Sequence, residues 1–186
     1  MPLLLSYPHP DLYDPVRDPS LAPEEKGKVF LRWVSGYYAH GDTLETLAQR
    51  DTLSDPRPSI ESMSPDDLIQ NLYAEGAQPD HMDLIVLQSG HQQGTFERNR
   101  VAALSPSRAT ASDREWGEIE FKFIWGERSA WLFVWGAWEF KADMTKNAKE
   151  GKDSEKKQTR KTSMVCIPGG NHFVSACMAL RPWVHS

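Results

Sequence analysis

The chain has 186 residues, of which 39% are hydrophobic and 25% charged, a balance typical of a folded globular protein and not of a disordered one. Its net charge of -5 disfavours a general nucleic-acid binder, which needs a basic surface to neutralise phosphates. Two cysteines exclude a disulfide framework, and no Cys or His spacing indicates a metal site, so we expect neither metal nor cofactor.

Residues 1–21 contain five prolines, which predict an extended and irregular N-terminal segment. The first five residues are apolar, but they lack the basic region and the longer apolar run of a signal peptide. No stretch approaches the roughly 18 apolar residues of a membrane span. We therefore expect a cytoplasmic protein without a membrane span.

Residues 22–104 have the pattern of a helical region without a strand. A helix is expected over residues 22–39, with Pro23 in its first turn and Gly41 after its end. Its apolar residues fall on one face, which comprises Phe30, Trp33, Val34 and Tyr37. The sequence Asp42-Thr43-Leu44-Glu45 resembles a capping box and predicts a short helix that runs to about Arg50.

Two further helices are expected in this region. Ser64 caps the first, whose buried side comprises Leu68, Ile69, Leu72 and Tyr73. Residues 80–98 predict the second. Within it, residues 84–87 are also compatible with a buried strand, but the amphipathic pattern extends beyond these four residues and favours a helix.

The character of the chain changes after a polar linker at residues 105–117. Residues 118–125 alternate polar and apolar side chains as a strand does, and residues 130–149 predict an aromatic-rich helix. A second strand is expected at 161–167, where Cys166 reads as a small buried hydrophobe. Such a strand–helix–strand unit places two parallel strands side by side. Both faces of a parallel sheet need cover, so further strands are expected.

A histidine follows the second strand at once, in the sequence Ile167-Pro168-Gly169-Gly170-Asn171-His172-Phe173. The glycines permit a tight turn, so the imidazole is presented at the carboxyl end of the strand. Catalytic groups of α/β proteins often lie on loops at this edge of the sheet. The first strand ends in Trp125-Gly126-Glu127-Arg128-Ser129, at the same edge.

These two motifs resemble the last two strands of an α/β-hydrolase, and they are most similar to a group of fungal members. The resemblance implies an α/β fold in which a helical cap (22–104) is followed by a C-terminal strand–helix–strand unit (118–186) of an incomplete core. It also implies that the earlier strands, the oxyanion donors and the nucleophile elbow precede residue 1. A helix normally follows the histidine in this family; residues 174–180 resemble its start, but Arg181-Pro182 ends it, which departs from the family pattern.

Carried over to this chain, the resemblance makes His172 the triad histidine, a general base. The acid it implies is Glu127, the nearest carboxylate, because Ser129 stands where many family members have an Asp. No G-x-S-x-G occurs in the sequence, so the nucleophile is absent. The resemblance therefore implies descent from a hydrolase of ester or related bonds. Alone the chain would be inactive, and it would act on a small-molecule substrate only if a missing N-terminal half completed it.

Two alternatives remain open. One is a non-catalytic binding or interaction protein derived from the same fold, which would associate with itself or another chain through an exposed sheet edge. The other is an unrelated α+β domain, in which the two strands pair elsewhere. In every case we expect Trp125 and Trp131 to serve packing and not to contact a substrate.

Overall fold

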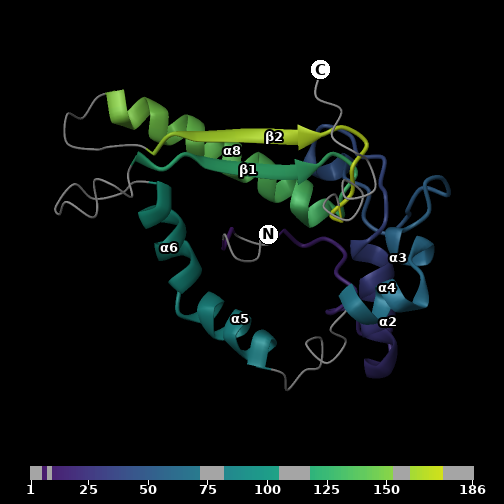
Figure 1. The fold of residues 1–186 in the computed structure, drawn as a ribbon. Helices are drawn as coiled ribbons and strands as arrows, with labels where there is room; N and C mark the ends of the chain where they lie inside the picture. Colours follow the sequence, from purple (N-terminus) through teal and green to yellow (C-terminus); the bar gives the residue numbers. More distant parts are fainter. Residues whose placement is uncertain (1–5, 8–9, 72–81, 105–117, 153–159, 174–186) are drawn as a thin grey trace. The chain divides into compact units, whose positions relative to one another are not determined.

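A computed structural model describes residues 6–7, 10–71, 82–104, 118–152 and 160–173 (Figure 1). The chain forms two compact units whose segments interleave in the sequence. The first comprises Met1–Pro8, Val86–Ile124 and Trp135–Val165, and the second comprises His9–Ile85, Trp125–Val134 and Cys166–Ser186. The expected linker at 105–117 and the expected helix start at 174–180 lie outside the described residues, and the division into a cap and a core portion stays a prediction.

The described elements follow the order that the sequence predicts, helices first and then strand, helix and strand. They are α2 (Pro23–Val34), η1 (Leu44–Thr46), α3 (Ser59–Ser62), α4 (Pro65–Asn71), α5 (Met82–Gln92), α6 (Thr95–Leu104), β1 (Phe121–Gly126), α8 (Trp131–Lys152) and β2 (Thr162–Ile167). The two strands run parallel as neighbours (Figure 1). Bonds from Phe121 N to Lys161 O (2.8 Å) and from Glu127 N to Ile167 O (3.1 Å) keep one register along the pair. The fold is thus mixed α/β, with a small parallel sheet.

Helix α8 covers one face of the sheet within the first unit. Phe121 and Phe123, two residues apart on β1, place their ring centroids 5.8 and 4.9 Å from that of Phe140. Phe140 is only 1% exposed, whereas Ile124, which points to the opposite face, is 56% exposed. The alternation predicted for this strand is therefore confirmed, but the cover expected on the second face is not present among the described residues.

Tyr7 is held against α8 in the first unit. Its ring meets Trp135 edge to face, with centroids 6.2 Å apart, and its hydroxyl donates to Asp143 Oδ2 at 2.9 Å. The Arg100 guanidinium lies 4.1 Å from the centre of the Tyr7 ring and 3.4 Å from the same carboxylate oxygen. Burial is the main cause that raises the pKa of Tyr7, so the phenol stays protonated and keeps donating this bond.

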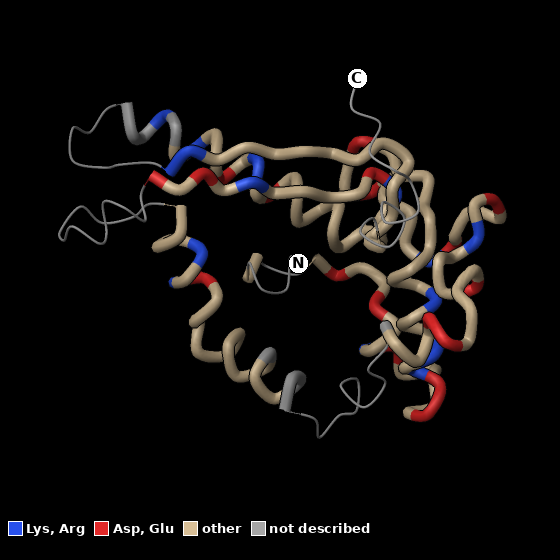
Figure 2. Tube along the Cα trace, viewed as in Figure 1, with Lys and Arg blue, Asp and Glu red and all other residues tan. Residues whose placement is uncertain are grey.

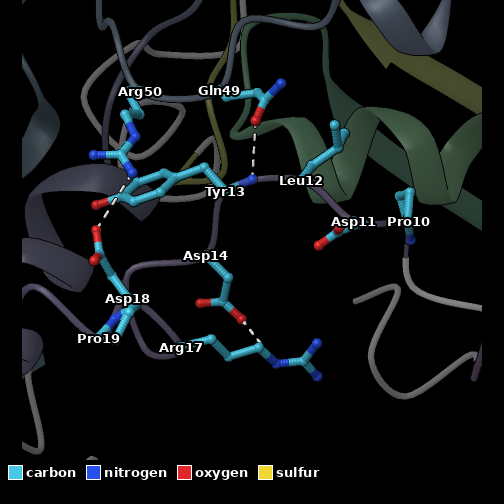
Figure 3. A pocket seen from close by; sticks show the side chains of 10 residues that line it. All are labelled: Pro10, Asp11, Leu12, Tyr13, Asp14, Arg17, Asp18, Pro19, Gln49 and Arg50. Carbon is cyan, nitrogen blue, oxygen red and sulfur yellow. Dashed lines mark hydrogen bonds and ion pairs between the residues drawn. The ribbon is translucent and has the colours of Figure 1, made fainter.

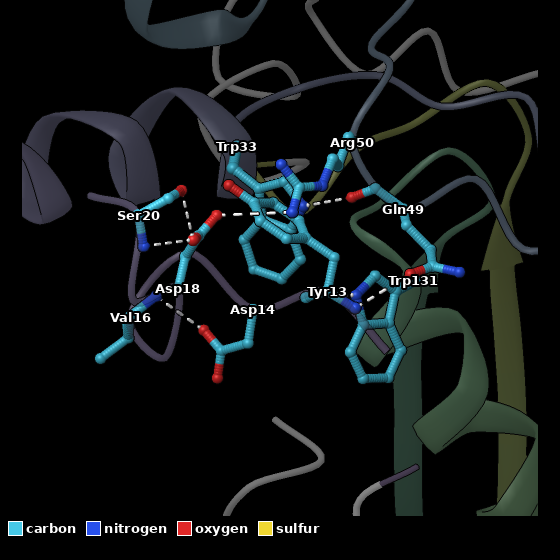
Figure 4. A network of polar contacts seen from close by, with 9 residues as sticks. All are labelled: Tyr13, Asp14, Val16, Asp18, Ser20, Trp33, Gln49, Arg50 and Trp131. Carbon is cyan, nitrogen blue, oxygen red and sulfur yellow. Dashed lines mark hydrogen bonds and ion pairs between the residues drawn. The ribbon is translucent and has the colours of Figure 1, made fainter. Parts of the chain in front are cut away.

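The irregular N-terminal segment is fixed in the second unit by tryptophan side chains (Figure 4). Trp131 Nε1 donates to the carbonyl of Tyr13 at 2.7 Å, and the N–H of Tyr13 donates to Gln49 Oε1 at 2.9 Å. Trp33 Nε1 in turn donates to the carbonyl of Gln49 at 2.7 Å. Trp131 is completely buried, so the prediction that it serves packing is confirmed.

Helix α2 ends five residues earlier than predicted, at Val34 and not at residue 39. The following backbone bonds to distant partners: the N–H of Tyr38 donates to the carbonyl of Arg128 at 3.1 Å. These tertiary bonds replace the helical ones, and tertiary context commonly overrides helix propensity in this way. The prediction that Gly41 ends the helix is therefore wrong.

The helix predicted from Asp42 to Arg50 is also wrong, because only the three-residue turn η1 forms there. Side chains take the backbone groups that a helix would need. The N–H of Ala48 donates to His40 Nδ1 at 3.1 Å, and the carbonyl of Gln49 accepts the Trp33 indole bond. Both contacts come from outside the predicted helix, so its local sequence gives no sign of them.

Helix α4 begins as predicted but buries less than predicted. Ser64 Oγ accepts the N–H of Asp67 at 3.1 Å and Asp67 Oδ2 accepts the N–H of Ser64 at 3.3 Å, which is a reciprocal cap. Ile69 is 79% exposed, so its assignment to the buried side is wrong. It lies about 100° around the helix from the half-buried Leu68. Residues 72–73, which complete that predicted side, lie outside the described residues.

Residues 82–92 and 95–104 are helical, which confirms the choice of helix over strand for 84–87, but two helices replace the single one predicted over 80–98. Residues 80–81 lie outside the described part. The helix is interrupted near Gly94, which has a φ of +63° and donates its N–H to the carbonyl of His91 at 3.0 Å. Positive φ favours glycine, and this residue therefore separates α5 from α6. In the described part of the chain, none of the helices combines the length and apolar character that crossing a membrane requires.

Acidic and basic residues are interspersed along the described chain (Figure 2). This mixture accompanies a net charge of -5 for the whole sequence. The expectations that the chain is no nucleic-acid binder and that it is cytoplasmic stay predictions.

Candidate functional site

The turn after β2 carries the predicted base and lies against the turn after β1. Gly169 has a φ of +67°, a conformation that favours glycine, and the N–H of Gly170 closes the turn on the carbonyl of Ile167 at 3.1 Å. The carbonyl of Gly170 accepts the N–H of Arg128 at 2.8 Å. The two strand-end motifs are therefore joined directly through their backbones.

Gly126 permits this close approach. A Cβ atom at this position would meet the backbone carbonyl oxygens of Asn171 and Gly170. Backbone atoms cannot rotate away as a flexible side chain does, so a residue larger than glycine must displace the turn. Packing alone thus explains why a glycine stands at position 126, whether or not the site is catalytic.

The imidazole of His172 lies flat on an aromatic ring of α8. Its centroid is 3.7 Å from that of Phe133, with 13° between the planes, and Phe173 meets it edge on at 5.8 Å. Burial lowers its pKa to about 4, so the ring is neutral at pH 7 and has a nitrogen able to accept a proton. Among the described residues, no group hydrogen-bonds to either ring nitrogen.

The carboxylate of Glu127 orients the turn and not the imidazole. Its Oε2 accepts the N–H of Gly169 at 2.8 Å, across from the end of β2. The structure thus brings Glu127 and His172 to the same edge of the sheet but does not join them by a hydrogen bond. To act as the triad acid, Glu127 would have to bring a carboxylate oxygen within hydrogen-bond distance of the His172 imidazole, a contact that the described residues do not make.

Cys166, near the end of β2, is exposed, and its expected role as a buried hydrophobe is wrong. That expectation followed from the apolar strand pattern around Cys166, and parallel sheets are usually covered on both faces. The described residues contain only two strands, so β2 has an open side. Partial burial and the nearby Glu127 carboxylate raise the pKa of the thiol, which keeps it protonated at neutral pH.

Asn171 is a buried polar residue that no local sequence pattern marks as part of a site. It is completely buried, and its Nδ2 donates to the carbonyl of Ser35 at 2.6 Å and to Ser59 Oγ at 2.8 Å. Its Oδ1 accepts the N–H of Phe173 at 2.9 Å. Asparagine after two glycines is an ordinary turn signal. Nothing in the local sequence shows partners more than one hundred residues away.

His40 is a second imidazole with a fixed role. Its Nε2 lies 2.7 Å from the carbonyl of Ser129 and its Nδ1 accepts the N–H of Ala48, so the proton is on Nε2. The ring also stacks on Tyr38, with centroids 5.7 Å apart. Burial lowers its pKa, which favours this neutral form. Because both ring nitrogens bond to backbone groups, His40 stabilises the fold and is not available as a base.

A surface hollow of about 470 Å³ lies elsewhere in the second unit (Figure 3). It is lined by Pro10, Asp11, Leu12, Tyr13, Asp14, Arg17, Asp18, Pro19, Gln49 and Arg50. Its charges largely pair with one another: Arg50 lies 3.7 Å from the centre of the Tyr13 ring and 3.4 Å from Asp18 Oδ2. Neither His172 nor Glu127 lines it. In the described part of the chain, no three His, Cys, Asp or Glu residues are grouped to hold a metal.

No protein-family model, curated protein or solved structure matches this chain. The resemblance to α/β-hydrolases therefore stays a prediction from the two strand-end motifs.

Proposed function

We propose that the chain is part of an α/β-hydrolase-type fold and descends from an enzyme with a nucleophile–histidine–acid triad. The observation that carries this proposal is the position of His172, on the turn that leaves a parallel strand beside the end of its neighbour. The carboxyl edge of such a sheet is where α/β proteins bind ligands. A neutral imidazole at this edge has the protonation state that a general base needs.

In this proposal His172 takes the proton from a nucleophile that attacks an ester or a related bond of a small molecule, and returns it to the leaving group. Glu127 is the candidate acid. The 186 residues contain no G-x-S-x-G, so within them His172 has no nucleophile to activate. We therefore propose that this chain alone does not catalyse hydrolysis.

The test is turnover of short esters by the purified chain. With p-nitrophenyl acetate and butyrate, the expected rate equals that of buffer, because general-base assistance needs a positioned nucleophile. His172→Ala should give the same rate. His91→Ala is the matched control, since it removes an imidazole whose Nδ1 bonds Ser6 outside the proposed site.

Hydrolysis that His172→Ala abolishes and His91→Ala preserves would contradict inactivity and reveal a nucleophile within the chain. The proposed α/β-hydrolase-type fold depends on the parallel pairing of β1 and β2. Nuclear Overhauser contacts that show β1 and β2 antiparallel or apart would remove the observation on which the proposal stands.

A second candidate function is a non-catalytic interaction protein, and the open face of the sheet favours it. The register places Ile124 beside Val165 on that face, and the two side chains are 56% and 37% exposed. Parallel sheets are normally covered on both faces, and exposed apolar strands mark sites of association. A partner chain or a second copy would then supply the missing cover.

Self-association is measured by sedimentation velocity over a range of protein concentrations. If the open face is an interface, the wild type should shift to larger species as concentration rises, and Ile124→Lys should suppress the shift. Ile69→Lys is the control, because Ile69 is equally apolar and 79% exposed on α4. A wild type that stays monomeric throughout and melts cooperatively would argue against an interface on this face.

A further inference from the structure

We propose that Asn171 is a positioning residue for His172, which it holds by anchoring the turn after β2 to Ser35 and Ser59. The carboxamide is completely buried and each of its polar atoms has a partner. Buried polar groups with all bonds satisfied give a segment one defined conformation, whereas a missing partner is costly. The turn thus has an anchor that the sheet alone does not supply.

The hydrogen bonds settle the orientation of the amide. The backbone N–H of Phe173 can only donate, so the atom that faces it must be the carbonyl oxygen Oδ1. The carbonyl of Ser35 can only accept, so the atom that faces it must be the amino group Nδ2. Rotating the amide by 180° would oppose donor to donor and acceptor to acceptor. Only this orientation of the amide satisfies both the N–H of Phe173 and the carbonyl of Ser35.

This rotamer fixes the backbone on both sides of the imidazole. Asn171 precedes His172, and its Oδ1 holds the N–H of Phe173, the residue that follows. The ring then lies parallel to Phe133 at 3.7 Å. With the flanking backbone anchored, the imidazole has little freedom to leave this aromatic surface.

The anchors come from the place where two helices of the second unit meet. Ser35 directly follows α2 and Ser59 begins α3, and Arg32 of α2 pairs with Glu61 of α3 at 2.8 Å. The N–H of Ser59 also donates to the carbonyl of Ser35 at 2.9 Å. Through Asn171, the position of the proposed base thus depends on the α2–α3 junction.

The functional meaning of this inference rests on the proposed role of His172, but its measurement does not. The readout is the pKa of His172, followed by NMR titration of its imidazole carbon-bound protons. Partial burial of the ring lowers the pKa of His172 to about 4, against 6.5 for a free side chain. In Asn171→Ala the anchor is lost and the ring gains access to water, so the pKa should rise by at least one unit.

Ser59→Ala is the milder variant, since it removes one of the two acceptors of Nδ2 and leaves Ser35 in place. It should raise the pKa in the same direction by a smaller amount. If Asn171→Ala does not fold, Ser59→Ala provides the test of the proposal. An unchanged pKa of His172 in Ser59→Ala would overturn it.

Leu47→Ala is the control for general loosening. Leu47 is 4% exposed in the same unit and is not one of the hydrogen-bond partners of Asn171, so its truncation lowers stability and leaves the anchoring bonds in place. The pKa of His172 should stay at its wild-type value in this variant. An equal rise in Leu47→Ala, or no change in Asn171→Ala, would show that Asn171 is not a positioning residue. Ester turnover reports on the proposed function separately, so the two failures are distinguishable.

Discussion

Trp131→Ala should lower the free energy of unfolding by about 3–5 kcal/mol, the range for removing a fully buried large aromatic side chain. Trp131 is completely buried at the start of α8, and its indole N–H holds the carbonyl of Tyr13 at 2.7 Å. The substitution leaves a cavity and deprives that carbonyl of its donor, and both effects act in the same direction. Urea denaturation followed by far-ultraviolet circular dichroism measures the change.

Trp131→Phe separates these two effects. It keeps most of the ring but loses the indole donor, so the expected loss is about 1–3 kcal/mol, typical of a buried polar group left without its partner. Trp125→Ala, at a half-buried position on β1, should cost less than Trp131→Ala. If Trp131→Phe were as stable as the wild type, the bond to Tyr13 would contribute nothing and the N-terminal segment would need another anchor.

The sequence predicts the burial of Trp131 but not its partner. Hydrophobic periodicity shows which face of an element is buried, and it does so for β1; for α8 the density of aromatic residues indicates burial but no particular face. It carries no information on what that face contacts, and Tyr13 lies 118 residues away. The same limit explains the early end of α2 at Val34, where bonds to distant backbone replace helical ones that local propensity favours.

The candidate site is also predictable from the sequence only in part. The apolar run and the glycines before His172 are local signals, and they predict an imidazole at the end of a strand. Asn171 and His40 carry no such signal, because the residues next to them in the sequence do not show which distant groups they bind. Their burial depends on Ser35, Ser59 and the turn at Ser129, which the chain brings near only when it is folded.

The bond between Glu127 and Gly169 could not be read from the sequence either. Proximity of the two strand ends follows from parallel pairing, so a carboxylate after β1 is expected near the turn after β2. Which donor it selects depends on distances of a few tenths of an ångström. Glu127 Oε2 accepts the backbone N–H of Gly169 at 2.8 Å, whereas a triad would need a bond from the carboxylate to the imidazole. Resemblance of motifs therefore indicates where the groups lie and not how they are connected.

Gly126→Ala should destabilise the chain by about 3 kcal/mol, at the upper end of what inserting a methyl group into a packed site costs. The added Cβ meets the backbone carbonyls of Asn171 and Gly170, which no side-chain rotation can relieve. The turn after β2 must move, so the bond from Arg128 N to Gly170 O should weaken. Urea denaturation gives the stability, and hydrogen exchange of the Arg128 amide reports the local opening.

Gly27→Ala is the matched control, because the same methyl group in the middle of α2 meets nothing within 4 Å. It should raise stability by roughly 0.5–1 kcal/mol, since alanine loses less backbone entropy than glycine in a helix. If Gly→Ala lowers stability at position 126 and raises it at position 27, the backbone entropy of glycine is separated from its role in close packing. If Gly126→Ala matched the wild type in stability and in protection of Arg128, the strand end and the histidine turn would not be in contact. The geometry that places His172 beside β1 would then be wrong, whatever the chain's activity.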